Sequence, residues 1–373
     1  MAAAENTAAN RVSGNSADPF FGCHHERSAT PPDFRNDIAS ETMSTLEEIA
    51  SRAGCSMATV SRVLNRSGPV SEGMVRRVRK AASDLGYHRI ERSLPPGRRR
   101  PVVGVLIPSI TNPVFAASLS GIQNRMRVSG HGVLIAQSDY DPSREADAVD
   151  YLLAEKPTGL ILTVCDPLKS QSTLPAFLPP TVLLNNLPTS RFPAAVTTDN
   201  RLAGREITTH LIEHGHQRIL FVSGRFESSD RARLRYEGYR EAMEAGGLPI
   251  NEALQISFTT GYDDLDLAQA MSLHCPTAII ASNDLLALGV ISALRREGLS
   301  VPGDVSVAGF DGIAIGRLVH PPLTTIEMAD ASMGATAASL LLDIAENSAT
   351  PRHLRIGYKL NLGGTVRRID QGF

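Results

Sequence analysis

The chain has 373 residues, of which 42% are hydrophobic and 20% charged, and it contains no tryptophan. This length predicts two or three globular domains, and no apolar run reaches the roughly 18 residues that a membrane-spanning helix needs. The net charge of -2 is unevenly spread, because residues 44–100 hold 12 Lys and Arg against 5 Asp and Glu. A basic block on an acidic body indicates that one end binds a polyanion; a solvated basic tail is the alternative that charge alone leaves open.

Residues 1–43 are rich in Ala, Ser, Asn, Asp and Pro without periodicity, which predicts a disordered N-terminal extension. Met43 directly precedes the first ordered pattern, so we consider it as an alternative to Met1 as the translation start. No secretory signal pattern is visible. The cysteines lack disulfide or metal spacing, as expected of a cytoplasmic protein; they are Cys23, Cys55, Cys165 and Cys275.

Residues 44–87 are predicted to form a compact headpiece of three helices. Thr45 and Glu48 form a capping box at the first helix, Gly54 permits the positive φ of a sharp turn, and Ser56 caps the second helix. Two short helices that cross at small residues around such a turn are typical of a helix-turn-helix. A helical hairpin without a nucleic-acid role is the alternative.

From residue 101 onwards, short apolar runs alternate with amphipathic segments of about 12–18 residues. This alternation predicts an α/β body of parallel sheets with helices on both faces, and its length predicts two lobes. Residues 88–100 form a basic linker before it. The predicted strands are 102–107, 132–136, 159–164, 181–185, 218–224, 277–282 and 304–310.

The run TLEEIASRAGCSMATVSRVLNRSGPVSEGMVRRVRKAASDLGY resembles the DNA-binding headpiece of the lactose-repressor (LacI) family of bacterial transcription regulators. The resemblance continues through VVGVLIPSITNPVFAASLSGI and ASNDLLALGVISALRREGLSVPGDVSVAGFDGI and covers about residues 45–365. It implies a periplasmic-binding-protein-like body over residues 101–373, with two lobes joined by three crossings. It also implies a homodimer, with two headpieces on a pseudo-palindromic site in double-stranded operator DNA.

Within the headpiece, the resemblance places the helix of residues 57–65 in the major groove. Met57, Ala58 and Arg62 align with base-reading positions, and Arg62 can bond a guanine with two donors. The other polar residues suit phosphate contacts or capping, which position the protein without specifying sequence. The predicted DNA-contacting residues are Thr45, Ser56, Met57, Ala58, Thr59, Ser61, Arg62, Asn65 and Leu94.

The linker departs from the family pattern. In relatives this segment forms a hinge helix on the operator, and a leucine, here Leu94, wedges into the minor groove. Pro95 disfavours helical geometry at Leu94, so a shorter hinge or a plain flexible tether are both alternatives.

The resemblance also places a small effector in the cleft between the lobes. Arg235 matches an arginine that binds polar ligand groups, Asp311 an acid that accepts from ligand hydroxyls, and Asn185 stands where many relatives have Asp. An Arg–Asp pair that is structural, across the cleft, is the alternative. The predicted effector contacts are Ser109, Asn112, Phe115, Asn185, Arg235, Asn283 and Asp311.

These observations predict a DNA-binding transcription regulator, a repressor whose operator affinity a sugar or sugar acid controls. PSITNPVFA and LNLGGTV look most like gluconate-type regulators, and Arg235 would suit a carboxylate; a neutral sugar or a purine corepressor remains open. A solute-binding protein for sugar transport and an α/β enzyme are the alternatives, but no phosphate-binding, dinucleotide-binding or nucleophile motif is present. We expect no enzymatic activity and no cofactor or metal. His210 and His214, in the run His210-x3-His214-x-His216, are an i,i+4 pair that could bind a metal, but no third ligand is evident. The expected location is the cytoplasm, at the nucleoid.

Overall fold

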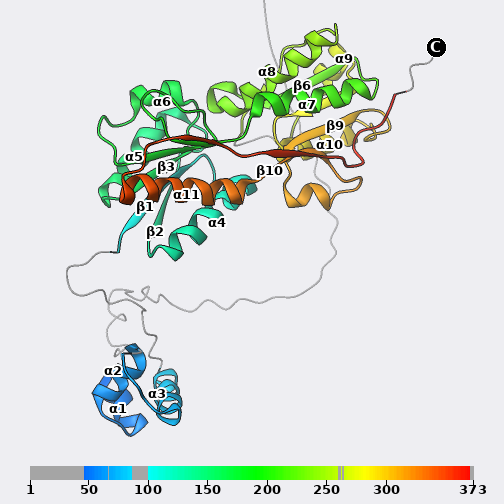
Figure 1. The fold of residues 1–373 in the computed structure, drawn as a ribbon. Helices are drawn as coiled ribbons and strands as arrows, with labels where there is room; N and C mark the ends of the chain where they lie inside the picture. Colours follow the sequence, from blue (N-terminus) through cyan, green and yellow to red (C-terminus); the bar gives the residue numbers. More distant parts are fainter. Residues whose placement is uncertain (1–45, 66, 86–99, 259–261, 263, 370–373) are drawn as a thin grey trace, which may run out of the picture. The chain divides into compact units, whose positions relative to one another are not determined.

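The computed structural model describes residues 46–65, 67–85, 100–258, 262 and 264–369. These residues belong to two units, residues 1–93 and 94–373 (Figure 1). The predicted N-terminal extension, Met43, Thr45 and most of the linker with Leu94 lie outside the described residues. The domain boundaries at residues 43, 87 and 100 therefore stay predictions.

Three helices make the headpiece: α1 (Leu46–Ala53), α2 (Met57–Asn65) and α3 (Glu72–Asp84). Ile49, Val60 and Val78, one from each helix, are fully buried and form the centre of its core. Gly54 has a φ of 63° between α1 and α2, a conformation that costs other L-residues about 1–2 kcal/mol. The predicted helix-turn-helix is confirmed in this part of the chain.

The body contains two six-stranded sheets, one in each lobe (Figure 1). The first sheet has the order β11-β5-β4-β3-β1-β2 and is parallel throughout. Its strands are β1 (Val102–Ile107), β2 (Gly132–Gln137), β3 (Gly159–Leu162), β4 (Thr181–Leu184), β5 (Ala195–Thr197) and β11 (His353–Arg355). The first lobe carries α4 (Pro113–Val128), η1 (Pro142–Arg144), α5 (Glu145–Ala154), α6 (Pro167–Thr173) and α11 (Asp330–Asn347).

The second sheet has the order β12-β10-β9-β8-β6-β7, and its pairs are parallel except β10 with β12. Its strands are β6 (Ile219–Gly224), β7 (Leu254–Ile256), β8 (Ala278–Ala281), β9 (Ser306–Asp311), β10 (Thr324–Met328) and β12 (Tyr358–Asn361). The second lobe carries α7 (Asn200–Glu213), η2 (Phe226–Ser228), α8 (Asp230–Ala245), α9 (Ala268–His274), α10 (Asp284–Arg296) and η3 (Ala314–Arg317).

The described chain passes between the two sheets three times: after β5, after β10 and between β11 and β12. Figure 1 shows β11 and β12 as one red ribbon along both lobes. The two lobes and three crossings confirm the expected architecture. Side chains at these crossings can contact both lobes.

Glycines let two helix pairs pack backbone against backbone. A Cβ atom at Gly204 of α7 would lie 2.1 Å from the carbonyl oxygen of Arg235, and one at Gly238 of α8 would lie 1.9 Å from that of Arg201. Gly121 of α4 and Gly334 of α11 face the opposite helix equally closely, at 1.9 and 2.0 Å from backbone oxygens. The α7–α8 contact matters for function because both helices begin at the pocket described below.

All seven predicted strands are present, with ends that differ by no more than two residues from the prediction. Five strands of three to five residues were not predicted: β5, β7, β10, β11 and β12. These segments mix polar and apolar residues, whereas the equally short β3 and β8 are wholly apolar runs, so their pairing partners in the sheet define them.

His216 is buried between the second sheet and the C-terminal segment. Its Nδ1 lies 3.0 Å from the Thr277 hydroxyl and its Nε2 lies 3.1 Å from the carbonyl oxygen of Arg367. Within the described residues, no group of three or more His, Cys, Asp and Glu side chains could hold a metal ion. His216 therefore has a structural role in this fold.

Protonation of His216 should destabilise the body at acidic pH. Burial lowers the pKa of His216 to about 4, whereas the unfolded chain binds this proton below about pH 6.5. The contribution is therefore fully present above pH 6.5 and is lost as the pH falls towards 4, by up to about 3 kcal/mol. Urea unfolding of the wild type and of His216→Gln at several pH values measures this, and an equal pH dependence in both would contradict it.

The DNA-reading face and the pocket between the lobes

The headpiece core holds α2 by one side and leaves the other accessible. Val60 and Val63 are buried and Leu64 packs against the same core; the three lie at helical spacing on one side of α2. The Ser56 hydroxyl accepts from the backbone N–H of Thr59 at 3.2 Å, which confirms Ser56 as a helix cap. The Ser56 and Thr59 hydroxyls also lie 2.9 Å apart.

The accessible side of α2 is formed by the residues predicted to meet DNA. Met57 is 52% exposed although it is a large apolar side chain, and Ala58 and Arg62 are exposed as well. Thr59 and Ser61 are half-buried. Asn65 ends the helix, and its side chain lies outside the described part. An exposed face with one cation and two apolar side chains suits a groove of DNA.

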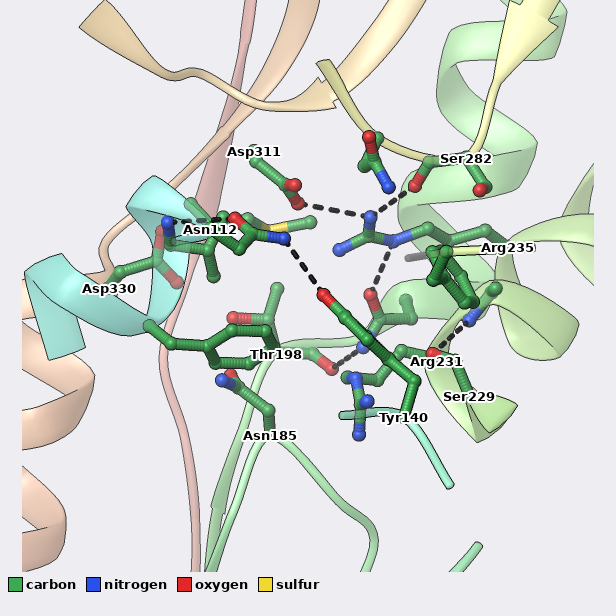
Figure 2. A pocket seen from close by; sticks show the side chains of 17 residues that line it. Asn112, Tyr140, Asn185, Thr198, Ser229, Arg231, Arg235, Ser282, Asp311 and Asp330 are labelled. Carbon is green, nitrogen blue, oxygen red and sulfur yellow. Dashed lines mark hydrogen bonds and ion pairs between the residues drawn. The ribbon is translucent and has the colours of Figure 1, made fainter. Parts of the chain in front are cut away.

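The body contains a pocket between its two lobes, with about 540 Å³ of space, open solvent at its mouth included (Figure 2). Six of the seven predicted effector residues line it. Ser109 is not among the lining residues, and its hydroxyl lies 2.9 Å from that of Thr111 in the same loop. The expectation for Ser109 is therefore not supported by this pocket.

Asn112 and Asn283 hold helices in place at the pocket rim. Asn112 Oδ1 accepts from Val114 N–H at the start of α4, and its Nδ2 donates to the Tyr140 hydroxyl at 3.0 Å. Asn283 Oδ1 caps α10 by accepting from Leu286 N–H at 2.8 Å. Both amides are thus partly or wholly used by the protein.

Arg235 lies at the centre of a buried polar network. Its Nη1 donates to Asp311 Oδ1 at 3.0 Å and to the carbonyl oxygen of Ser282 at 2.6 Å, and its Nε donates to Asn200 Oδ1 at 2.8 Å. Its guanidinium carbon also lies 4.7 Å from the ring centre of Phe310. The Arg–Asp pair is therefore real, but both partners belong to the second lobe and do not bridge the cleft.

Burial raises the pKa of Asp311, and Arg235 opposes this rise by stabilising the carboxylate. Asp311 has a φ of 104° and Asn185, at the end of β4, a φ of 67°. Non-glycine residues in the positive φ region are uncommon and collect at functional sites. Both of these residues line the pocket.

Aromatic side chains from both lobes meet at the pocket. Tyr140 of the first lobe stacks on Phe258 of the second, with ring centres 4.7 Å apart, and Phe115 meets Tyr140 edge to face at 6.2 Å. Their rings give the pocket an apolar wall beside its charged groups, an arrangement suited to the mixed surface of a small organic ligand.

A polar link between the lobes lies next to this wall. The N–H of Asp230 donates to the carbonyl oxygen of Cys165 at 2.7 Å, and Arg231 Nη1 donates to that of Val164 at 3.0 Å. Asn186 Nδ2 donates to the Asp230 carboxylate at 2.9 Å. Burial raises the pKa of Asp230 to about 6. The first residues of α8 thus bond the segment that follows β3 in the first lobe. A movement of α8 at the pocket would therefore affect both lobes.

Comparison with known proteins places these features in a family. The family described as "Bacterial regulatory proteins, lacI family" matches residues 45–89, and "Periplasmic binding protein-like domain" matches residues 208–366. The chain is 31% identical to the HTH-type transcriptional regulator GntR of Escherichia coli (strain K12), over 86% of this chain and 98% of the relative. It is 30% identical to the ribose operon repressor of the same strain, over 80% and 92%. This chain belongs to the LacI family.

The solved structure of the lac repressor dimer bound to operator and the anti-inducer ONPF agrees with this assignment. It has a TM-score of 0.65 and 25% identity, over 87% of this chain and 99% of that one. As a LacI-family member, the chain is a DNA-binding transcription regulator with a helix-turn-helix headpiece and a ligand-binding body. Its relatives are regulators rather than enzymes, and no described helix is long and apolar enough to cross a membrane.

Several residues that line the pocket were not predicted from the sequence to do so. They are Tyr140, Thr198, Asn200, Ser229, Arg231, Phe258, Ser282 and Asp330, with apolar neighbours. A signal existed for Arg231, because it lies four residues before Arg235 and so on the same face of α8. Asn200 and Asp330 follow the short strands β5 and β10, which were not predicted.

Proposed function

We propose that this LacI-family regulator represses transcription by binding an operator through α2, and that a sugar or sugar acid in the pocket controls its operator affinity. The observation that carries the effector role is the position of the pocket at the crossings, with side chains of both lobes in its wall. A ligand there would change how the lobes meet, and coupling of about 1–3 kcal/mol is typical of such linkage.

A sugar-type ligand is supported by the pocket chemistry and by the relatives. Asp311, Asp330, Asn185 and Arg231 offer acceptors and donors beside an aromatic wall, which suits a compound with hydroxyls on a carbon skeleton. One relative is named a ribose operon repressor, and two solved relatives contain ribose and cellobiose. A homodimer on a two-fold operator, located at the nucleoid in the cytoplasm, completes the proposal.

On the DNA side, Met57, Ala58 and Arg62 are proposed to contact base edges. Ser56, Thr59, Ser61 and Asn65 are proposed for phosphate contacts or capping. Thr45 and the Leu94 wedge stay proposals from the family resemblance.

Arg62→Ala should weaken binding to the cognate operator by about 1–3 kcal/mol and relax the sequence preference at one position, because Arg62 supplies the main direct hydrogen-bond readout on α2. Fluorescence anisotropy with the operator and with single-base variants measures both effects. Arg127→Ala, which removes an exposed arginine of the body, is the control and should leave affinity unchanged. Equal weakening by Arg62→Ala on every DNA sequence would instead make Arg62 a phosphate contact.

Ligand control is tested by a thermal-shift screen of sugars and sugar acids, followed by gel shifts with each compound that binds. We expect at least one compound to raise the melting temperature and to change operator affinity. A compound that stabilises the body and leaves operator affinity unchanged would argue against an effector role for the pocket.

A further inference from the structure

Two arginines of α8 line the pocket, and they differ in how far the protein satisfies them. Arg235 uses Nη1 and Nε on Asp311, Ser282 and Asn200. Arg231 uses Nη1 on Val164 and Asp230, but its Nη2 is buried and has no hydrogen-bond partner within the described residues. A buried donor of a charged group without an acceptor is costly, so Arg231 is the group that a ligand would complete.

We propose, on the basis of the function proposed above, that the effector is a polyhydroxy carboxylic acid whose carboxylate binds Nη2 of Arg231 rather than Arg235. A guanidinium is suited to carboxylates because its donors lie in a fixed planar fork. Arg231 is only 7% exposed, so an ion pair formed there would be little screened by water and salt.

Asn185, a second uncommitted polar side chain of the pocket, is also compatible with an acid. Its side chain is half-buried, lines the pocket and makes no hydrogen bond within the described residues. The amide can donate to a carboxylate, whereas an aspartate in this place would repel one. An uncharged residue here therefore favours an anionic ligand.

The side of the pocket that faces Arg231 determines the orientation of the bound ligand. Figure 2 shows Asp330 and Asn112 on one side and Arg231, Ser229 and Arg235 on the other. The Asp330 side chain is 8% exposed and makes no hydrogen bond or ion pair within the described part of the chain. Burial raises the pKa of Asp330 well above its usual value, and its carboxyl group can exchange hydrogen bonds with ligand hydroxyls. We therefore place the hydroxyls at Asp330 and the acid end at Arg231.

Asp230 does not occupy the position proposed for the ligand carboxylate. It approaches Nη1 of Arg231 at 3.2 Å and accepts from Asn186 on the first lobe. A neutral sugar hydroxyl could also accept from Nη2, but it would lack the charge assistance of a carboxylate. Pairs of compounds that differ only at this group therefore decide between the two.

The test measures binding of matched compounds to the full chain by calorimetry and thermal shift. The acids are D-gluconate, D-galactonate, D-mannonate, D-glucuronate and D-galacturonate; the neutral partners are D-glucitol, D-galactitol, D-mannitol, D-glucose and D-galactose. We expect at least one acid to bind and its neutral partner to bind about tenfold more weakly or worse. Arg231→Met should weaken the acid by a similar factor. Arg240→Met is the control, because Arg240 lies on the same helix, is exposed and does not line the pocket.

Two further variants keep the test decisive where Arg231→Met folds poorly. Arg231→Lys retains the charge without the fork and should weaken the acid less. Asn185→Asp, at a half-buried position, should weaken the acid and spare neutral compounds. The inference is overturned where no acid binds, where a neutral partner binds as tightly as its acid, or where Arg231→Lys and Asn185→Asp both bind the acid like the wild type. A neutral compound that binds and changes operator affinity would overturn the inference and leave the proposed function intact.

Discussion

Gly238→Ala is expected to destabilise the body by about 3 kcal/mol or more. The added Cβ would lie 1.9 Å from the carbonyl oxygen of Arg201 and 2.7 Å from the backbone nitrogen of Arg205. Backbone atoms in the first two turns of α7 cannot rotate away as a flexible side chain can, so the two helices must separate and lose close packing. Urea or thermal unfolding of the full chain measures the loss.

Helix separation at Gly238 should also reach the pocket. Asn200 at the start of α7 bonds Arg235 of α8, and Arg231 lies on the same helix as Gly238. The folded fraction of the Gly238→Ala variant should therefore also bind the ligand more weakly. Gly357→Ala is the control, because a Cβ there would meet no atom within 4 Å, and its stability should change by no more than about 0.5 kcal/mol. Equal stability of both variants would show that α7 and α8 tolerate a wider spacing.

Arg235→Met is expected to destabilise the body by about 3–5 kcal/mol, since it leaves Asp311 as a buried charge without its partner. Asp311 is 7% exposed and lies 3.0 Å from Arg235. The variant also removes the bonds to Asn200 and Ser282, which join α7 and the end of β8 to α8. Unfolding in urea at neutral pH measures the change.

The double variant Arg235→Met, Asp311→Asn separates the charge effect from the packing effect. Asparagine tolerates the positive φ of residue 311 and carries no charge, so at least half of the lost stability should return. If the double variant were as unstable as the single one, the hydrogen bonds to Asn200 and Ser282 rather than the buried charge would account for the loss.

Arg231 connects the pocket directly to the contact between the two lobes. One of its nitrogens donates to Val164 of the first lobe at 3.0 Å, while Arg231 itself belongs to the second lobe. A ligand acceptor on the other nitrogen would fix the guanidinium in the orientation that links the lobes. Ligand binding and lobe closure would then favour each other, as linkage between two groups on one side chain requires.

The sequence by itself determined the parts of this protein that depend on local pattern. The headpiece helices follow from apolar spacing that buries Val60 and Val63, from the left-handed turn at Gly54 and from the cap at Ser56. The seven predicted strands follow from buried apolar runs between helical segments. Family resemblance added the two lobes, the three crossings and six of the pocket residues, because each lies beside a motif that is continuous along the chain.

Tertiary structure decided which polar groups meet and which stay free. Arg235 and Asp311 are 76 residues apart and lie in one lobe, a fact that spacing cannot reveal. Asp330 and Asn200 enter the pocket at crossings that follow short strands, and those strands are defined by pairing rather than by propensity. The unfilled donor of Arg231 is visible only once Val164 and Asp230 are placed beside it, because hydrogen-bond satisfaction is a property of the folded surroundings and not of the residue.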